Sequence, residues 1–376
     1  MKEQNIGNKR KEYLEKIAAQ ERKTSNMSKH NSDEFRHSDK KNRRSDNVFL
    51  HYATPVIVTG IIVVLGCIVF LIIRWSRGTD LNISDVELSE DYSSESLDWY
   101  SYFNPYDVPG YEDDGKMNIV ILGDDSIYSF NDETGIPALI REATGANVTA
   151  IALPRQTWCL STDSYSLDNP EQAFSFVYLA QFLSLHDYDL LSKAAPLTDN
   201  ESIYRYYVAK LYQTDFGLTD ILILCLGRDD YLEARALSQS AESIVAANGS
   251  QNYNNLQGAM VYGFQALQRQ FPYMQLIICS PSYFMIPDEN GNLVGADVTS
   301  NGVSTLADYI SHMSGVCNMI SGVTFVDNYY GFEINETTAG KYLEPDMLYP
   351  NAEGRKLIAD HILEFLYFIR NNQTAE

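Results

Sequence analysis

The apolar run DILILCL, at residues 220–226, has a single polar residue, at its start. The polar residues Arg228, Asp229 and Asp230 follow it after one glycine, so the run ends in a turn. A strand with apolar side chains at nearly every position is covered on both faces, which is typical of a parallel sheet. The run therefore predicts an interior strand with helices on both sides of its sheet.

Four further apolar runs have the same character, and segments with helical periodicity separate them. The runs are residues 118–122, 147–153, 275–280 and 323–326, and the helical segments are 136–143, 171–185, 202–212, 253–270, 303–319 and 351–370. This alternation predicts a doubly wound α/β domain with a five-stranded, mostly parallel sheet of the flavodoxin-like type. Residues 283–301 predict a hairpin.

The N-terminal third of the chain has a different composition. Residues 55–73 are an uncharged run of 19 residues, long enough to cross a hydrocarbon core of ~30 Å as a helix. Residues 1–50 carry a net charge of +5, and the rest of the chain carries −27. The positive-inside rule then places the N-terminus in the cytoplasm and the C-terminal part outside the cell membrane. We expect a disordered basic tail (1–52), a transmembrane signal anchor in the bilayer (53–75), an acidic extracellular stalk (76–116) and the α/β domain (117–376).

Charge and cysteine usage exclude several classes of function. A body this acidic is unsuited to bind nucleic acid, whose phosphates require a basic surface. The five cysteines show no paired spacing of the kind that zinc sites use, and no motif implies a cofactor. Cys159 and Cys317 are candidates for a disulfide, but the sequence does not require one.

Three polar blocks fall where predicted strands or loops end at one edge of the sheet. They are Gly123-Asp124-Asp125-Ser126, Gly227-Arg228-Asp229-Asp230 and DMLYPNAEG at residues 346–354. In this order they resemble the conserved blocks of the SGNH/GDSL hydrolases, over most of residues 117–370. The resemblance implies a nucleophilic serine in the first block, an asparagine donor to the oxyanion in the next, and a catalytic Asp and His in the last.

The blocks depart from the family pattern at most of the functional positions. Tyr349 stands in the place of the histidine, and a phenol that titrates near ~10 cannot relay a proton at neutral pH. Asp229 stands in the place of the asparagine, where a carboxylate would repel an oxyanion. An ungapped alignment puts Asp125 on the nucleophile, whereas alignment from the serine puts Ser126 there, and the sequence does not distinguish the two. Asp346 matches.

A further family block, which supplies a backbone donor from a glycine, corresponds to residues 152–157. This stretch has no glycine, and Pro154 has no N–H to donate. Arg155 is either an anion ligand or an ordinary surface arginine. The ligand-binding candidates at this edge are Gly123, Asp124, Arg155, Gly227 and Tyr231.

The departures predict a domain of SGNH/GDSL type without a working triad, and the apolar run predicts that it is anchored in the membrane and extracellular. Its expected role is to bind cell-envelope glycans or to assist their modification, with an acyltransferase as a candidate partner. The alternative is an active esterase, O-acetyltransferase or deacetylase that uses Ser126. A second alternative is a divalent-cation site, because Asp124, Asp125, Asp229 and Asp346 would converge there. Tyr128, Trp158, Tyr231 and Tyr349 suggest a surface for sugar stacking.

Overall fold

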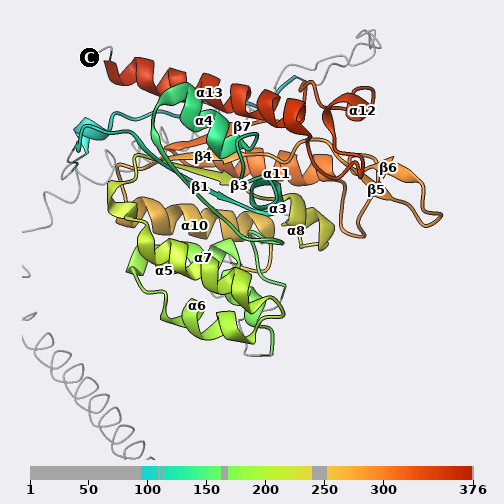
Figure 1. Ribbon diagram of the computed structural model, residues 1–376, viewed down its shortest axis with the longest axis horizontal. Helices are drawn as coiled ribbons and strands as arrows, with labels where there is room; N and C mark the ends of the chain where they lie inside the picture. Colours follow the sequence, from blue (N-terminus) through green and yellow to red (C-terminus); the bar gives the residue numbers. More distant parts are fainter. Residues whose placement is uncertain (1–94, 109–110, 112, 162–167, 239–251, 375–376) are drawn as a thin grey trace, which may run out of the picture. The chain divides into compact units, whose positions relative to one another are not determined.

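The computed structural model describes residues 95–108, 111, 113–161, 168–238 and 252–374 (Figure 1). All of them belong to one compact unit, Ser89–Glu376. The predicted tail and membrane anchor lie outside the described residues. Among the helices in the described ranges, none has both the length and the apolar character needed to cross a bilayer.

A five-stranded sheet forms the centre of this unit. Its strands are β1 (Asn118–Gly123), β2 (Asn147–Ala152), β3 (Ile221–Cys225), β4 (Gln275–Cys279) and β7 (Val323–Val326). They lie in the order β2-β1-β3-β4-β7, and every neighbouring pair is parallel. This is the flavodoxin-like order, in which the chain reverses direction across the sheet next to β1. The predicted doubly wound sheet is confirmed.

Helices cover both faces of the sheet, because successive strand residues point to opposite sides. Ile119 and Ile121 join one hydrophobic core, and Val120 and Leu122 join the other. The first face carries α4 (Ile136–Thr144), α12 (Ala339–Tyr342) and α13 (Ala352–Thr374), and the second carries α5 (Phe176–Leu185), α7 (Glu201–Gln213), α10 (Leu256–Gln270) and α11 (Leu306–Met319). Figure 1 shows α4 and α13 on one side of the sheet and α10, α5 and α7 on the other.

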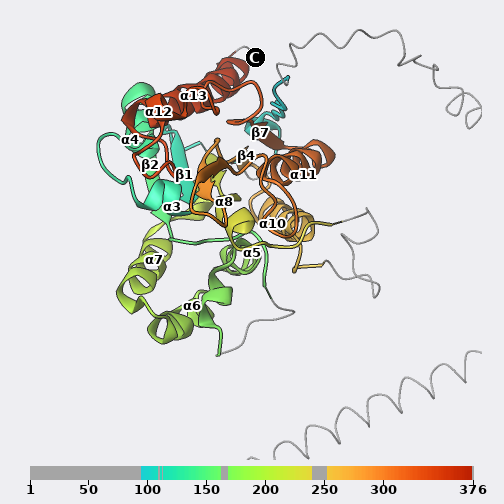
Figure 2. The ribbon, with the colours of Figure 1, turned by 90° about the vertical axis from the view of Figure 1, so that its right-hand side faces the viewer.

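Shorter elements complete the domain. They are the helices α3 (Asp125–Tyr128), α6 (Asp189–Ala194) and α8 (Arg228–Leu232), the 3-10 turns η2 (Pro105–Asp107), η3 (Pro170–Phe174), η4 (Ala195–Leu197) and η5 (Phe216–Leu218), and the antiparallel hairpin β5 (Met285–Pro287) and β6 (Leu293–Gly295). The hairpin confirms the prediction for residues 283–301. α3 and α8 directly follow β1 and β3, and they lie near each other in Figure 2.

The single helix predicted at residues 171–185 is instead two elements, η3 and α5. Ser175 between them has extended backbone angles (φ −59°, ψ 149°). The N–H groups of Phe176 and Val177 donate to the carbonyls of Thr157 and Trp158. These backbone bonds to a distant loop replace the bonds that would have continued the helix, so the break has a tertiary cause.

The segment at residues 95–104, which belongs to the predicted stalk, packs on the domain. Trp99 pairs with Phe325 of the edge strand β7 through two backbone hydrogen bonds of 3.0 and 2.9 Å. The carboxylate of Asp98 lies 3.1 Å from Nε2 of His361 on α13. His361 therefore connects this segment to the domain.

Candidate functional site

The turn after β1 holds the first block. Asp124 is buried and caps α3, and its Oδ1 accepts the N–H and the hydroxyl of Ser126 at 2.9 and 2.7 Å. Asp125 points differently, because its Oδ2 accepts the backbone N–H of Arg155 at 2.8 Å. The two candidates for the nucleophile position thus have separate partners, a buried carboxylate for Ser126 and a backbone donor for Asp125.

The block at residues 152–157 contains a backbone donor after all. Arg155 has a φ of 58°, the left-handed conformation that glycine usually adopts. Its N–H donates to Asp125, so the backbone donor that follows Pro154 is already engaged by a carboxylate. The Arg155 side chain is 66% exposed and pairs with Glu233 at 2.6 Å, as an ordinary surface arginine does.

The third block turns sharply at Gly227. Its φ is 118°, and a Cβ there would lie 2.8 Å from Sδ of Met313, so only glycine fits. Asp229 comes next in α8 and is buried, and its Oδ2 has no hydrogen-bond partner among the described residues. Burial and the neighbouring charge of Asp124 raise its pKa to about 9. A raised pKa favours the neutral acid, which weakens the repulsion expected from a carboxylate here.

Asp230 has a structural role in the same helix. Its carboxylate accepts the backbone N–H of Trp158 at 2.9 Å and that of Cys159 at 3.4 Å. Burial raises the pKa of Asp230 to about 7. The side chain therefore joins α8 to the loop after β2.

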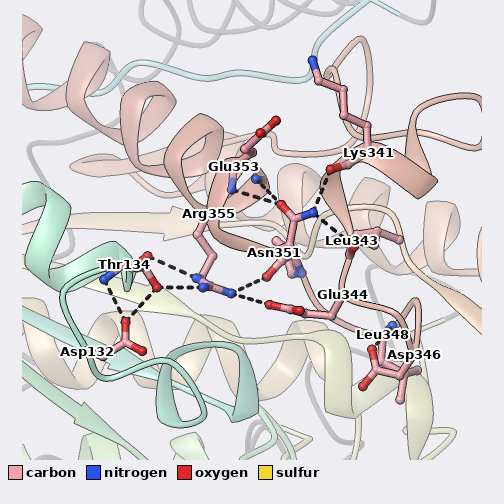
Figure 3. Close-up of polar contacts among 12 residues, drawn as sticks. Asp132, Thr134, Lys341, Leu343, Glu344, Asp346, Leu348, Asn351, Glu353 and Arg355 are labelled. Carbon is pink, nitrogen blue, oxygen red and sulfur yellow. Dashed lines mark hydrogen bonds and ion pairs between the residues drawn. The ribbon is translucent and has the colours of Figure 1, made fainter.

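The last block places Tyr349 beside Arg228. The guanidinium carbon of Arg228 lies 4.2 Å from the centre of the Tyr349 ring, and Phe130 meets that ring edge-on at 5.8 Å. Asp346 is exposed, and its Oδ1 accepts the N–H of Leu348 at 2.9 Å within its own turn (Figure 3). The phenol at the histidine position is thus held by an aromatic and cationic contact.

Two polar residues hold this turn in position (Figure 3). Asn351 caps α13 by accepting the N–H groups of Glu353 and Gly354 at 3.0 and 3.1 Å. The guanidinium of Arg355 donates to Thr134 (2.7 and 3.1 Å), to Glu344 (3.1 Å) and to the carbonyl of Pro350 (2.7 Å). These bonds link the loop before α4 to the turn that carries Tyr349.

Side chains from all of these elements line one pocket. Its volume is about 50 Å³, room for a few waters or a small group. The lining includes Asp124, Ser126, Arg228, Tyr349 and Arg355, together with Ile136, Cys225, Leu226, Cys279, Ser280, Pro281, Ser282, Phe284, Asn328, Leu348, Pro350 and Ile358. No histidine is among these described residues.

Only some of the predicted site residues line this pocket. The predicted site residues Asp124, Ser126 and Tyr349 line the pocket, and so do Arg228 and Arg355, which were not among the predicted site residues. The remaining candidates do not line it and are Gly123, Asp125, Arg155, Gly227, Asp229, Tyr231 and Asp346. The sequence did contain an indication of the role of Arg228, because a basic residue directly before two aspartates is a candidate to balance their charge.

Two predictions about this edge are wrong. Trp158 and Tyr231 are fully buried and cannot form a sugar-stacking surface. The cation site is not formed either, because among the described residues no three His, Cys, Asp or Glu side chains gather so as to hold a metal ion. The guanidinium of Arg228 provides the positive charge beside Asp124 and Asp229 instead. The four described cysteines, Cys159 and Cys317 included, are free.

No family model matches this chain, and neither does any curated protein. Solved structures with a similar fold include a possible lipase from Chitinophaga pinensis (14% identity, TM-score 0.42, covering 69% of this chain and 100% of that one). Others are a protein described as a GDSL-like lipase from Parabacteroides merdae (13%, 0.39, 66% and 95%) and one described as a lipolytic protein of the G-D-S-L family from Desulfitobacterium hafniense (13%, 0.34, 66% and 99%).

The blocks quoted from the sequence meet at the carboxyl edge of a flavodoxin-like sheet, as the resemblance requires. The parallel sheet and the edge at which the blocks meet are those that the resemblance to the SGNH/GDSL hydrolases implies. The glycines and the capping asparagine of the blocks have structural roles, whereas Tyr349 and Asp229 stand where the resemblance would place the histidine and the asparagine.

Proposed function

We propose that this protein is a catalytically degenerate SGNH-like domain, anchored in the cell membrane and facing outward, that binds acylated envelope glycans or assists an acyltransferase that modifies them. The environment of Ser126 is the main observation that supports this proposal. Its hydroxyl donates to Asp124, and the place of the imidazole is taken by a tyrosine stacked on Arg228. A serine without an imidazole base is a weak nucleophile.

The anchoring and the orientation rest on the apolar run at residues 55–73 and the basic residues ahead of it. Protease added to intact cells is expected to digest the chain beyond about residue 78 and to spare the tail. Digestion of the tail alone would reverse the orientation and remove the envelope from the proposal.

A second candidate function has one observation in its favour. Asp124 lies 2.7 Å from the Ser126 hydroxyl, and burial raises the pKa of this carboxyl, which makes it a stronger base than an ordinary Asp. An esterase or acetyltransferase that uses Ser126 with Asp124 as its base is therefore the alternative.

Covalent labelling separates the two candidates. A fluorophosphonate reacts only with an activated serine, so we expect no labelling of Ser126 and no hydrolysis of aryl acetates above that of Ser126→Ala. An active GDSL lipase in the same assay controls for reagent quality. Stoichiometric labelling that Ser126→Ala abolishes would establish the esterase and refute degeneracy.

Glycan binding has its own test. The full-length protein is expected to co-sediment with isolated envelope polysaccharide, and to do so less after mild alkali has removed the ester-linked acyl groups. Equal sedimentation with both preparations would show that acyl groups are not recognised. Sedimentation with neither would remove the glycan from the proposal.

A further inference from the structure

Arg228 is a buried cation in the wall of the pocket, and it has unused hydrogen-bond donors. Its side chain is 8% exposed. The guanidinium faces the rings of Tyr349 and Phe284, at 4.2 and 5.7 Å from their centres. Nε and Nη1 have no hydrogen-bond partner anywhere in the described part of the chain. Stacked rings fix the plane of a guanidinium and leave its edges to select a ligand.

The neighbouring carboxyls do not supply a hydrogen-bonded counter-ion. The nearest, Oδ1 of Asp229, lies 3.7 Å from Nη1, beyond hydrogen-bond distance. Asp124 already accepts two bonds from Ser126. Burial raises the pKa of both carboxyls, which disfavours their charged forms. The pKa of Arg228 lies above its ordinary value although burial alone would lower it, and a guanidinium is not deprotonated in proteins, so Arg228 stays charged.

The contrast with Arg355 is informative, because both arginines are buried and line the same pocket. Arg355 donates to Thr134, Glu344 and Pro350 and is fully engaged in holding the fold. Nε and Nη1 of Arg228 make no such bonds among the described residues. A buried donor without a hydrogen-bonded partner is costly, so a site of this kind favours a ligand that supplies one.

We propose that the pocket binds a short-chain carboxylate, with its oxygens on the guanidinium of Arg228 and its alkyl group against the apolar wall. The small volume excludes a long chain, and Pro281 and Phe284 offer apolar contacts. A carboxylate matches a guanidinium in both charge and geometry. The inference rests on the proposed function, since it assigns the pocket to holding an acid rather than to cleaving an ester.

The test uses the purified full-length protein and sodium propionate at constant ionic strength. We expect a saturable rise in melting temperature, as for any ligand of the folded state, and none with propionamide, the uncharged analogue. Arg228→Gln should weaken the apparent affinity about 10-fold or more, the loss of a charge-assisted hydrogen bond. Arg228→Lys should weaken it less. Arg205→Gln removes an exposed arginine of α7 and is the matched control, with unchanged affinity.

Several outcomes would overturn the proposal. These are no saturable shift in the wild type, an equal shift with propionamide, or a larger shift with inorganic phosphate. If Arg228→Gln does not fold, Ser282→Phe decides, because it fills the pocket without changing charge and should abolish the shift. Labelling of Ser126 by the fluorophosphonate would refute the degenerate function whether or not propionate binds, so the two failures are distinguishable.

Discussion

Asp229→Asn should stabilise the protein, and the gain should grow with pH. The pKa of this carboxyl is about 9 in the folded state, against an ordinary value of 3.8. Between these values the folded protein holds a proton that the unfolded chain has released. The unfolding free energy therefore falls as the pH rises through this window. An asparagine of nearly the same shape has no proton to bind, so its stability lacks this dependence.

The magnitude follows from the pKa shift. One pKa unit corresponds to about 1.36 kcal/mol, so the interval from about pH 5 to about pH 8 corresponds to at most ~4 kcal/mol. We expect the difference between Asp229→Asn and wild type to increase by ~1–3 kcal/mol over this interval, because the new amide also faces the guanidinium of Arg228. Asp230 is present in both proteins, so its titration largely cancels in the comparison, whereas the pKa of Asp124 changes when its neighbour loses its charge, which keeps the expected difference below the limit.

Urea unfolding followed by tryptophan fluorescence measures this quantity, since Trp158 is fully buried against Phe176 and Phe264. Asp107→Asn, at an exposed position, is the control and should show no increase with pH. A difference between Asp229→Asn and wild type that stays constant or shrinks as the pH rises would refute the argument that Asp229 is a neutral acid in the folded state.

Three further predictions concern the framework of the site. Gly227→Ala should cost about 2 kcal/mol or more of unfolding free energy in urea, because a Cβ would meet Met313 in a left-handed conformation. A normal midpoint would contradict this. A double-mutant cycle with Asp98→Asn and His361→Gln should give a coupling of ~0.5–1 kcal/mol at neutral pH. Burial alone would raise the pKa of Asp98, but its hydrogen bond to His361 lowers the pKa below the ordinary value for an Asp. The coupling should therefore be present at every pH above that ordinary pKa and should vanish as acid protonates the carboxylate. Tyr349→Ala should lower the unfolding free energy in urea by about 2 kcal/mol through the loss of the ring contact with Arg228, and Tyr349→Phe should keep most of the stability.

The sheet could be predicted because its strands are buried on both faces. Runs such as residues 220–226 have no polar side that a surface strand would show, and this pattern leaves few alternatives. The split of the helix at Ser175 could not be predicted, since its cause is backbone bonding to residues 157 and 158, which local propensity does not register.

The sequence predicted the edge of the sheet at which the candidate site lies, but not the electrostatics of its side chains. The resemblance to the family blocks and the predicted strand ends placed Ser126, Asp229 and Tyr349 at one edge of the sheet. The protonation of Asp229 depends on burial and on nearby charge, which no motif encodes. Arg228 could not be predicted as a site residue, because its contact with the ring of Tyr349 joins two blocks that are far apart in the sequence.

The pairing of Trp99 with Phe325 has a mechanical consequence. Edge strands expose unpaired backbone groups that invite other chains, and this pairing occupies part of the open side of β7. It also lies where the chain from the N-terminal region first enters the described domain. Any tension applied to the preceding residues would load these two backbone bonds and the Asp98–His361 contact before it reached the sheet. The Trp99–Phe325 pairing, which covers part of the edge strand, is thus also the contact at which we expect the domain to begin to unfold under force.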